Sequence, residues 1–374
     1  MTNSTPPARL GPTPRPGVLG IERYVGGRAK APGGIRTVKL SANETPLGAS
    51  PEAMEACRGA VGRSHLYPDG GAVALREAIA AKHGLDPQRI LVGNGSDEIF
   101  HLLAQAYLGP GDEILHSAHG FLVYPIAARA AGADVVVVPE KNLTIDVDAL
   151  VARASPRTRM VSIANPNNPT GTYLPASEIV RLRQGLRADI LLVLDAAYAE
   201  YANVRGYTAG LEFVHDADNV VMTRTFSKVF GLAALRLGWA YCPLAVADAV
   251  DRIRSPFNVS SLAQAAGIAA LGDDKHLARA IAHNTEWRAW LTDEIGKIGN
   301  RAIEVVPSAG NFLLLRFPNT QGLTAAEADV HLTTKGLLLR RLDAYGLPDC
   351  LRLSVGLGED NRAVVEALKE FVHV

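Results

Sequence analysis

The sequence predicts an α/β protein: a large domain with a mostly parallel sheet flanked by helices, followed by a smaller α+β domain. Two observations support this prediction. Through the first two thirds of the chain, short runs of Val, Ile and Leu alternate with amphipathic, helix-compatible stretches. After about residue 256 the rhythm changes to long helical stretches mixed with short strands. Strands that are apolar on both faces are typical of a sheet covered by helices on both sides.

The elements of the first part follow from this alternation, in chain order. The predicted strands are Ile90–Val92, Glu113–Leu115, Val135–Val138, Met160–Ala164, Ile190–Leu194, Val220–Arg224 and Leu237–Cys242. The predicted helices between them are Ser96–Leu108, Leu122–Ala131, Asp146–Ala154 and Pro175–Leu186. The evidence for the strands is that each is a short run rich in Val, Ile and Leu and apolar on both faces, and the evidence for the helices is the amphipathic pattern of the stretches between them.

The second part begins with Ser260–Ile298, which contains no proline and is predicted to be helical throughout. The predicted strands that follow are Ala302–Val306, Asn311–Phe317, Leu337–Arg340 and Leu351–Val355, and the predicted helices are Ala325–Lys335 and Asp360–Val372. We therefore predict an N-terminal arm over 1–37, a large domain over 38–256, and an interdomain helix with a small C-terminal domain over 257–374. A cleft between two such domains is a favoured ligand site.

Composition narrows the range of partners and compartments. The 374 residues are enough to bury a core without disulfides or metal. Lys plus Arg (38) balance Asp plus Glu (38), so charge gives no reason to expect nucleic acid or an anionic membrane as partner. The three cysteines, Cys57, Cys242 and Cys350, form no CxxC pair, which argues against a disulfide framework or a cysteine zinc site.

The cytoplasm is the expected location, because the chain shows neither a membrane span nor a signal peptide. Its longest apolar runs are strand-sized, whereas a membrane helix needs about 18 or more apolar residues. Met1–Gly17 contains five prolines and no apolar stretch of the kind that a signal peptide carries. We expect this segment to be a flexible arm.

Two predicted loops have the composition of ligand-binding loops. Gly93–Glu98 (GNGSDE) lies between a strand and a helix, where glycines allow a sharp turn and the first helical amides attract phosphate. The alternative is an ordinary helix start with Ser96 or Asp97 as N-cap. Asn165–Gly171 (NPNNPTG) predicts a tight, rigid loop at a strand end, and its asparagines could serve only to close that turn.

Four charged residues are further candidates for chemistry. Asp195 directly follows an apolar strand, at the sheet edge where α/β proteins bind ligands, and the alternative is a helix cap. Lys228 lies in TRTFSKVFGLAALR (Thr223–Arg236), whose apolar residues could desolvate the amine, and the alternative is a solvated surface lysine. Arg340 and Arg352 lie on or beside C-terminal strands and suit a carboxylate or phosphate, with surface salt bridges as the alternative.

The order of these features points to one cofactor. A phosphate-binding helix start, an asparagine loop, a strand-end aspartate, an amine nucleophile and an arginine follow one another along the chain. A pyridoxal 5'-phosphate site needs a lysine that forms a Schiff base and a carboxylate at the pyridinium nitrogen. We therefore expect pyridoxal phosphate as the cofactor and no metal.

With these motifs, the sequence resembles the fold-type I pyridoxal-phosphate aminotransferases and, within them, the histidinol-phosphate aminotransferase family. The resemblance covers about Val38 to Gly356 and rests on LSANETPLG, LYPDGG, GNGSDE, HGFLVYPIAARAAGA, NPNNPTG, LDAAYAEY, TFSKVFGLAALRLG and CLRLSVG. NPNNPTG and the lysine segment are specific for the superfamily, and ANE, YPDG and GNGSDE together point to the family. The resemblance implies the PLP-transferase fold, with the cofactor held by the large domain.

The resemblance also assigns the cofactor contacts. Lys228 would bind the cofactor covalently and shuttle the proton. Asp195 would pair with the pyridinium nitrogen, while Asn168 and Tyr198 would hydrogen-bond the phenolic oxygen. Phe121 would stack on the ring, at a position where the family often has tyrosine. The residues expected to hold the cofactor phosphate are Gly95, Ser96, Asp97, Thr225, Ser227 and Arg236.

On the substrate side, Arg352 matches the arginine that binds the α-carboxylate of glutamate. The phosphate of histidinol phosphate is expected at the same arginine together with Arg340, Tyr24 and Asn43, so one cluster of donors would take either a carboxylate or a phosphate. Arg341 follows Arg340, where the family often has aspartate, so the sequence leaves open which of the two arginines faces the substrate.

The activity implied is a ping-pong exchange of an amino group between histidinol phosphate and 2-oxoglutarate, in histidine biosynthesis. Tyr67 resembles the tyrosine that reaches the phosphate of the neighbouring subunit's cofactor, which implies a homodimer with a shared active site. The alternatives are an aromatic or broad-range aminotransferase, a phosphothreonine decarboxylase, or a non-catalytic protein that binds pyridoxal phosphate.

Two other enzyme classes fit the sequence poorly. A Rossmann dehydrogenase would need GxGxxG, which is absent from the glycine loop. A metal hydrolase would have to use His116 and His119, whose spacing lacks the glutamate and the third ligand of a zinc site. Both histidines are expected in a surface loop.

Overall fold

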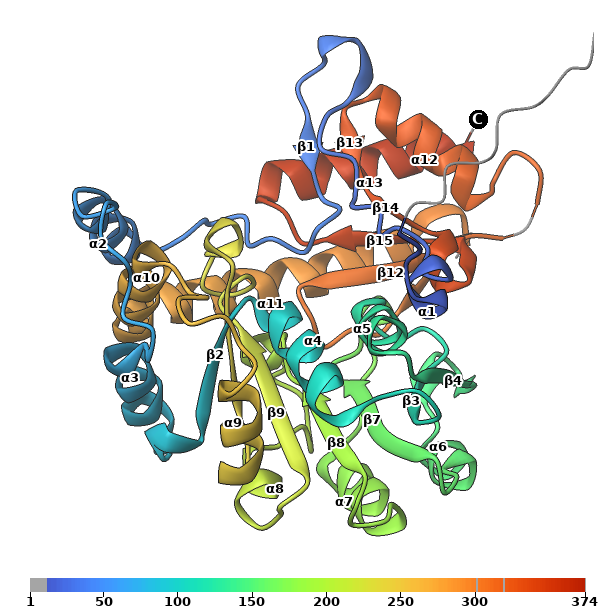
Figure 1. The fold of residues 1–374 in the computed structure, drawn as a ribbon. Helices are drawn as coiled ribbons and strands as arrows, with labels where there is room; N and C mark the ends of the chain where they lie inside the picture. Colours follow the sequence, from blue (N-terminus) through green and yellow to red (C-terminus); the bar gives the residue numbers. More distant parts are fainter. Residues whose placement is uncertain (1–11, 301, 319, 374) are drawn as a thin grey trace, which may run out of the picture.

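The computed structural model describes residues 12–300, 302–318 and 320–373, and its largest sheet has seven strands (Figure 1). These are β2 (Ile90–Asn94), β3 (Glu113–Ser117), β4 (Asp134–Val138), β7 (Thr158–Ala164), β8 (Leu191–Asp195), β9 (Val220–Thr225) and β10 (Leu237–Tyr241). The strand order is β2-β10-β9-β8-β7-β3-β4, and only β10 runs antiparallel to its neighbours. The predicted mostly parallel sheet is therefore confirmed.

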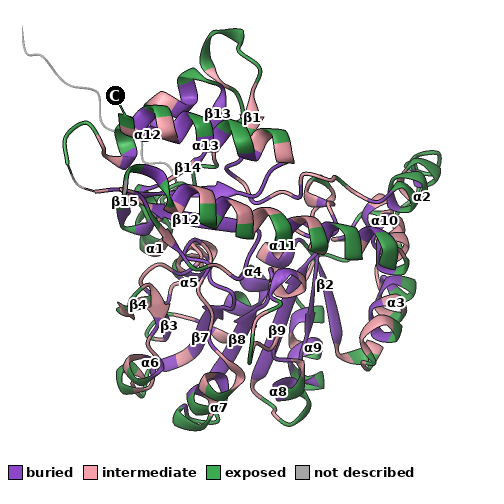
Figure 2. Cartoon of the chain, turned by 180° about the vertical axis from the view of Figure 1, so that it is seen from behind, coloured by how far each residue is buried: buried purple, intermediate pink, exposed green. Residues whose placement is uncertain are grey.

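Helices cover both faces of this sheet, as the apolar strands predict. In β8, Leu192 and Leu194 face one hydrophobic core, while Leu191 and Val193 face the other. The first core includes residues of α3 (Val73–His83), α6 (Val147–Arg153), α7 (Ala176–Gly185), α8 (Leu211–His215) and α10 (Ser261–Gly272). The second includes residues of α4 (Ser96–Tyr107), α5 (Val123–Ala131) and α9 (Leu244–Asp251). Figure 2 shows the resulting buried strands between exposed helix surfaces.

The strand at one edge departs from this pattern. The sequence predicts burial of both faces of Val135–Val138, but Val137 is 48% exposed. The reason is the position of β4 at the end of the sheet, where it has a neighbouring strand on one side only. A short antiparallel pair, β5 (Glu140–Lys141) and β6 (Thr144–Ile145), follows it.

The C-terminal part has its own antiparallel sheet and its own core. The sheet order is β11-β12-β15-β14, formed by β11 (Glu304–Val306), β12 (Phe312–Arg316), β15 (Leu347–Ser354) and β14 (Arg340–Leu342). The helices α12 (Ala325–Thr334) and α13 (Gly358–His373) contribute to that core. The predicted strand Leu337–Arg340 is two strands, because β13 (Leu337–Leu338) pairs instead with β1 (Val38–Lys39).

The long predicted helix over Ser260–Ile298 is broken into two helices. α10 ends at Gly272, and α11 (Asp274–Gly296) starts after Asp273, whose carboxylate accepts a hydrogen bond from the His276 N–H at 2.9 Å. Glycine at a helix end followed by an aspartate N-cap is sufficient to interrupt a helical sequence. α11 runs between the two sheets (Figure 1).

The sequence predicts a flexible arm over Met1–Gly17, of which residues 1–11 lie outside the described range; the end of this segment forms part of a helix. The short helix α1 (Pro16–Leu19) packs on α5. A Cβ added at Gly17 would come within 2.6 Å of the Arg129 carbonyl oxygen, so only glycine permits this contact. The chain then continues through α2 (Pro51–Val61), which packs against α10.

None of the helices in the described part of the chain combines the length and the apolar surface needed to cross a bilayer.

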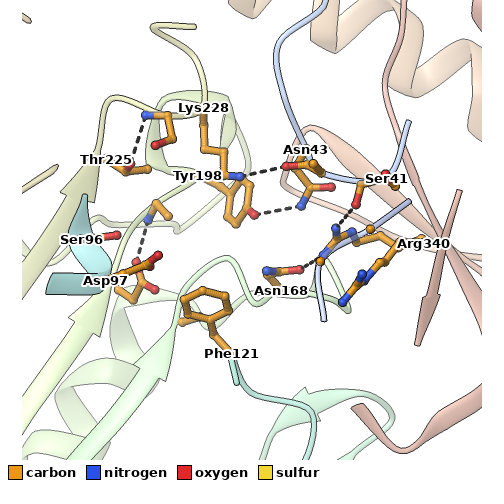
Figure 3. Close-up of a pocket in the computed structure, with 18 of the residues that line it drawn as sticks. Ser41, Asn43, Ser96, Asp97, Phe121, Asn168, Tyr198, Thr225, Lys228 and Arg340 are labelled. Carbon is orange, nitrogen blue, oxygen red and sulfur yellow. Dashed lines mark hydrogen bonds between the residues drawn. The ribbon is translucent and has the colours of Figure 1, made fainter. Parts of the chain in front are cut away.

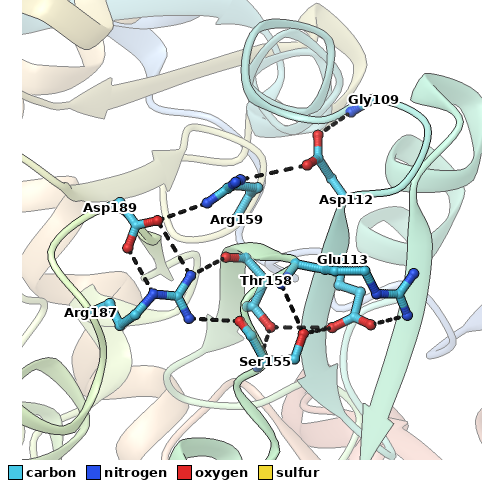
Figure 4. A network of polar contacts seen from close by, with 9 residues as sticks. Gly109, Asp112, Glu113, Ser155, Thr158, Arg159, Arg187 and Asp189 are labelled. Atoms are coloured by element: carbon cyan, nitrogen blue, oxygen red, sulfur yellow. Dashed lines mark hydrogen bonds and ion pairs between the residues drawn. The ribbon is translucent and has the colours of Figure 1, made fainter.

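A polar network binds together the amino-terminal ends of β3, β7 and neighbouring loops (Figure 4). At its centre, the buried Glu113 accepts hydrogen bonds from Ser155 at 2.6 Å and Thr158 at 3.3 Å, and it forms an ion pair with Arg157. Arg187 extends the network by donating to the Ser155 carbonyl at 2.6 Å. These donors compensate for the desolvation of the carboxylate.

Replacing Glu113 with alanine should therefore lower the free energy of unfolding by about 2 kcal/mol, because several donors would lose their acceptor. The matched control is Asp134→Ala, which removes an exposed partner of the same Arg157 and should cost less than about 0.5 kcal/mol. Urea denaturation of both variants measures the difference. Equal stability of the two variants would contradict this account of the network.

Candidate active site

A cavity of about 360 Å³ lies where β7, β8 and β9 end, between the two sheets (Figure 3). It brings together most of the residues predicted from the sequence. Those lining it are Tyr24, Asn43, Ser96, Asp97, Phe121, Asn168, Asp195, Tyr198, Thr225, Ser227, Lys228, Arg236, Arg340 and Arg352. Of the predicted site residues, Gly95 and Tyr67 do not line it. The carboxyl ends of parallel strands are the expected position for a ligand site in this class of fold.

The asparagine loop combines both roles considered for it. Asn165 closes the loop by exchanging two side-chain hydrogen bonds with Leu174, at 2.8 and 3.0 Å. Asn167 donates from its side chain to Thr170 at 3.0 Å. Asn168, in contrast, points into the cavity, where its side-chain oxygen accepts a hydrogen bond from Arg352 (Figure 3). The first two asparagines therefore build the turn that presents the third.

Lys228 is not the solvated surface lysine of the alternative interpretation. Its amine donates to the Ala42 carbonyl at 3.1 Å and lies 5.6 Å from the centre of the Tyr198 ring. Burial, followed by repulsion from the guanidinium of Arg352, lowers the pKa of Lys228 from 10.5 to about 8. Roughly a tenth of the amine is therefore neutral at pH 7, far more than for an ordinary lysine, and the neutral form is the one that acts as a nucleophile or base.

Asp195 ends β8 as a carboxylate that is only 4% exposed. It accepts hydrogen bonds from Tyr124 at 2.7 Å, from the Ala197 N–H at 3.2 Å and from Thr223 at 3.3 Å. No Lys, Arg or His side chain among the described residues forms an ion pair with it. Burial raises its pKa from 3.8 to about 6, although the Tyr124 hydrogen bond opposes the shift. The helix-cap alternative is wrong, because only the short 3₁₀ turn Ala199–Tyr201 follows.

Polar groups gather around Arg236 at the start of α4. The N-cap is Gly95, with φ of +78°, so the alternative that made Ser96 or Asp97 the cap is wrong. A Cβ at Gly95 would lie 2.4 Å from the Arg236 guanidinium, so glycine is what allows Arg236 to approach the helix start. Arg236 also donates to the Ser227 hydroxyl at 3.1 Å.

The members of this cluster suit a phosphate group. The first N–H groups of an α-helix lack intrahelical acceptors and attract anions. The Asp97 carboxylate forms an ion pair with Arg236 at 3.3 Å, and this contact orients the guanidinium. The Ser227 N–H donates to Thr225 at 3.1 Å, and this bond fixes the two hydroxyl residues relative to each other.

Tyr198 is fixed by Asn43, which sits at a junction of three chain segments. The Asn43 side-chain amide donates to the Tyr198 hydroxyl at 2.9 Å, and its N–H donates to Ser354 at 2.8 Å. Asn43 adopts φ of +56°, a left-handed conformation that asparagine tolerates better than most residues. Burial raises the pKa of Tyr198 to about 12, so the hydroxyl is protonated and can donate to a ligand.

Arg340 and Arg352 are direct neighbours across β14 and β15. Arg352 is buried and donates to the carbonyl of Ser41 at 2.7 Å, besides its bond to Asn168. Neither arginine pairs with a carboxylate among the residues that the structure describes, so the surface salt-bridge alternative is wrong. Two unneutralised guanidinium groups at one wall of a cavity favour an anionic ligand.

The structure distinguishes Arg340 from Arg341. Arg340 lines the cavity, donates to the Val25 carbonyl at 2.6 Å and lies 5.9 Å from the centre of the Tyr24 ring. Arg341 forms two hydrogen bonds to Asp343, at 2.6 and 3.1 Å, and does not line the cavity. Of the two arginines, Arg340 is therefore the one that faces this cavity.

Tyr67 lies outside this cavity. It is 83% exposed and stacks on Phe257, with 4.6 Å between the ring centres. Its predicted contact needs a second subunit, so it stays a prediction. Tyr124, the donor to Asp195, lies in the motif HGFLVYPIAARAAGA, but the resemblance assigns no role to it; its spacing of three residues from Phe121 is the sequence signal that points to it.

His116 and His119, the histidines that a metal hydrolase would have to use, do not line the cavity. His116 is buried on β3, so its expected place in a surface loop is wrong. His119 is bonded through its ring to the Tyr345 carbonyl at 2.7 Å. The described residues contain no group of His, Cys, Asp and Glu side chains arranged to hold a metal ion.

The cavity fits pyridoxal phosphate by the chemistry of its donors. Phe121 presents its ring to the cavity (Figure 3). Asp195 is a buried carboxylate without an ion pair among the described residues, and Lys228 is an amine with a lowered pKa. The cluster around Arg236 supplies donors for a phosphate. A cationic heterocycle with an aldehyde and a phosphate would satisfy each of these groups.

Comparisons with known proteins agree with this chemistry. The family model for aminotransferase class I and II matches residues 35–368. The histidinol-phosphate aminotransferase of Paramagnetospirillum magneticum is 54% identical over 96% of this chain and 99% of its own. That of Rhodospirillum centenum is 56% identical over 97% of this chain and 99% of its own.

Solved structures give the same assignment. The histidinol-phosphate aminotransferase of Sinorhizobium meliloti, in complex with pyridoxal 5'-phosphate, superposes with a TM-score of 0.86 at 28% identity, over 98% of this chain and 99% of that chain. Aspartate aminotransferase of Thermus thermophilus with maleate, at 23% identity, TM-score 0.79 and coverage of 90% and 92%, shares the fold. The chain is therefore a pyridoxal-phosphate-dependent transaminase of the class I and II aminotransferases and belongs to the histidinol-phosphate aminotransferase family.

Proposed function

We propose that this transaminase exchanges the amino group between histidinol phosphate and 2-oxoglutarate, in histidine biosynthesis. The observation that carries the proposal is the pair Arg340 and Arg352, which face the cavity without carboxylate partners among the described residues. Both partners of the exchange bring an anionic group, either a carboxylate or a phosphate. The names of the relatives, at 52–56% identity, support the same substrate pair.

For the cofactor, we assign the predicted residues as follows. Asp195 would hold the ring nitrogen, Asn168 and Tyr198 the phenolic oxygen, and Phe121 one ring face. The phosphate would bind to the cluster of Gly95, Ser96, Asp97, Thr225, Ser227 and Arg236. When bound, pyridoxal phosphate withdraws electrons from the substrate and stabilises negative charge at the α-carbon. The protein's task is then to orient the ring, keep Asp195 charged and move one proton.

Lys228 is the group that moves this proton. Its amine lies in the cavity beside Tyr198 and is not tied to a carboxylate in the described residues. With a pKa of about 8, the amine can accept a proton and return it at neutral pH. The wall formed by Arg340 and Arg352 would hold the anionic end of either substrate.

We infer that two copies of the chain form a dimer with shared active sites. Support comes from apolar side chains exposed on the single chain around Tyr67, including Leu66 and Phe257. Exposed apolar groups that lie together mark interaction surfaces. A cytoplasmic location is supported by the three cysteines, all of them free.

The substrate assignment is tested by a single-turnover spectrum. Cofactor-loaded protein is mixed with histidinol phosphate and, separately, with phenylalanine. We expect the visible absorbance of the bound cofactor to fall at least 10-fold faster with histidinol phosphate, because its phosphate engages Arg340. Equal or reversed rates would indicate an aromatic or broad-range aminotransferase. Loss of absorbance with neither would indicate a different substrate or a non-catalytic protein, and Lys228→Ala should be inactive with both.

Arg340 and Arg341 provide a matched pair of variants for the phosphate contact. Arg340→Ala should lower kcat/KM for histidinol phosphate about 10- to 100-fold, because a charge-assisted contact to the phosphate is lost. Arg341→Ala should change it less than about 3-fold, since that side chain is paired with Asp343. Steady-state kinetics of both variants give the comparison, and equal losses would exclude the assignment of Arg340.

The lowered pKa of Lys228 predicts a pH dependence of cofactor capture. Only the neutral amine reacts with an aldehyde, and burial disfavours the ammonium form. The rate of covalent capture of added pyridoxal phosphate by the apoprotein should therefore rise with pH to a midpoint near 8, rather than near 10.5. Stopped-flow absorbance gives the rate. The control is free lysine acetylated at its α-amine, whose ε-amine has the ordinary pKa and which also reports any titration of the cofactor itself. A midpoint matching the control would disprove the shift.

A further inference from the structure

Asp195 is hydrogen-bonded to Tyr124, a residue that does not itself line the cavity. Tyr124, on α5, is fully buried, and its hydroxyl donates to Oδ2 of Asp195 at 2.7 Å. The other carboxylate oxygen, Oδ1, accepts hydrogen bonds from Thr223 at 3.3 Å and from the Ala197 N–H at 3.2 Å. Tyr124 thus provides the shortest contact to this carboxylate and the only side-chain contact to Oδ2 among the described residues.

The surroundings of Tyr124 leave its ring little freedom. Phe100 and Phe121 both meet it edge to face, with ring centres 5.0 and 5.7 Å away. Phe121 lies just before α5 and faces the cavity (Figure 3), while Tyr124 lies in the first turn of that helix. One short segment therefore fixes both the aromatic wall of the cavity and the donor to Asp195.

The chemistry of a phenol suits this position. Burial raises the pKa of Tyr124 well above 10, and the charge of Asp195 raises it further. Tyr124 therefore remains a neutral donor throughout the working pH range and adds no charge of its own. A donor of this kind stabilises the carboxylate over the carboxylic acid.

We propose that Tyr124 is a positioning residue that keeps Asp195 ionised and oriented toward the ring nitrogen of the cofactor. The proposal rests on the assignment of Asp195 to that nitrogen, made under the proposed function. An ionised Asp195 favours the protonated ring, which is the form that withdraws electrons. Without Tyr124, burial would favour the neutral acid, which cannot stabilise a positive ring in the same way.

Several other titratable groups lie near the same carboxylate or line the same cavity. Asp97, on α4, raises the pKa of Asp195 through its negative charge. Tyr198, from the loop after β8, is protonated and bonded to Asn43. Lys228, which is cationic when protonated, and the guanidinium of Arg352 line the same cavity. These groups are unchanged when the Tyr124 hydroxyl is removed, so the effect of that hydroxyl can be measured by itself.

The test is the affinity of the apoprotein for pyridoxal phosphate in the variant Tyr124→Phe. We expect the dissociation constant to rise about 10-fold, the usual loss for a hydrogen bond to a charged group. The loss should be larger near pH 6.5 than near pH 8.5, because the pKa of Asp195 rises and more of it is protonated at the lower pH. Equilibrium titration of intrinsic fluorescence gives the constant at each pH.

The matched control is Tyr241→Phe. Tyr241 is also a fully buried tyrosine, on β10, but its hydroxyl has no hydrogen-bond partner among the described residues. This variant should bind the cofactor within 2-fold of the parent protein at both pH values. A purely structural role of Tyr124 would lower thermal stability without the pH-dependent loss of affinity, and that result would overturn the proposal.

A second comparison uses Asp195→Asn as background. Without the carboxylate, adding Tyr124→Phe should change the dissociation constant less than 2-fold, because the two residues act through one contact. Thr223→Val, which removes the longer bond to Oδ1, should give a smaller pH-dependent loss and serves if Tyr124→Phe does not fold. Parent protein that binds no pyridoxal phosphate would refute the function, whereas normal parent binding with an unchanged Tyr124→Phe would refute only this inference.

Discussion

The structure depends on the burial of charges that the protein itself does not neutralise. Asp195, Lys228 and Arg352 surround one cavity, yet none forms an ion pair with another described side chain. A buried carboxylate whose pKa is raised from 3.8 to about 6 costs the cofactor-free protein roughly 3 kcal/mol at pH 7. Because the folded-state pKa is the higher one, this cost is absent below about pH 4 and complete above about pH 7. A cationic ring beside Asp195 would remove it, so cofactor binding and stability are linked.

The cluster of polar groups around Arg236 depends on the close approach of β10 to the start of α4, as much as on the charge of the arginine. A Cβ at Gly238 would lie 2.2 Å from the Ser96 nitrogen, so β10 can run beside the start of α4 only because this residue is glycine. Arg236, with φ of +51°, leaves the extended path just before β10 and turns toward Gly95. Gly95, Gly238 and the left-handed backbone of Arg236 therefore place a guanidinium at the N-terminus of a helix. The guanidinium and the helix N–H groups favour the same anion.

Most of the fold and much of the cavity could be predicted from the sequence, because apolar periodicity and strand-end motifs are local signals. The break at Asp273 was missed, since a helix cap counts only when the neighbouring geometry is known. The choice between Arg340 and Arg341 also required the structure. Adjacent residues of a strand point to opposite faces of the sheet, and Asp343 forms an ion pair with Arg341 only. The contact of Tyr124 with Asp195 could not be predicted from local patterns either, because the two residues lie 71 positions apart in the sequence.

Asn43 shows why the site needs both parts of the chain. Its N–H and side-chain oxygen bond to Ser354 of β15, at 2.8 and 3.1 Å, and its carbonyl accepts from Asn311 at 2.9 Å. Its remaining amide group reaches across to Tyr198, beside the large sheet. The same C-terminal strand carries Arg352. A shift of the small sheet would therefore move the Arg352 guanidinium and the hydrogen bond to Tyr198 together, so the arginine wall of the cavity and the orientation of Tyr198 are mechanically coupled.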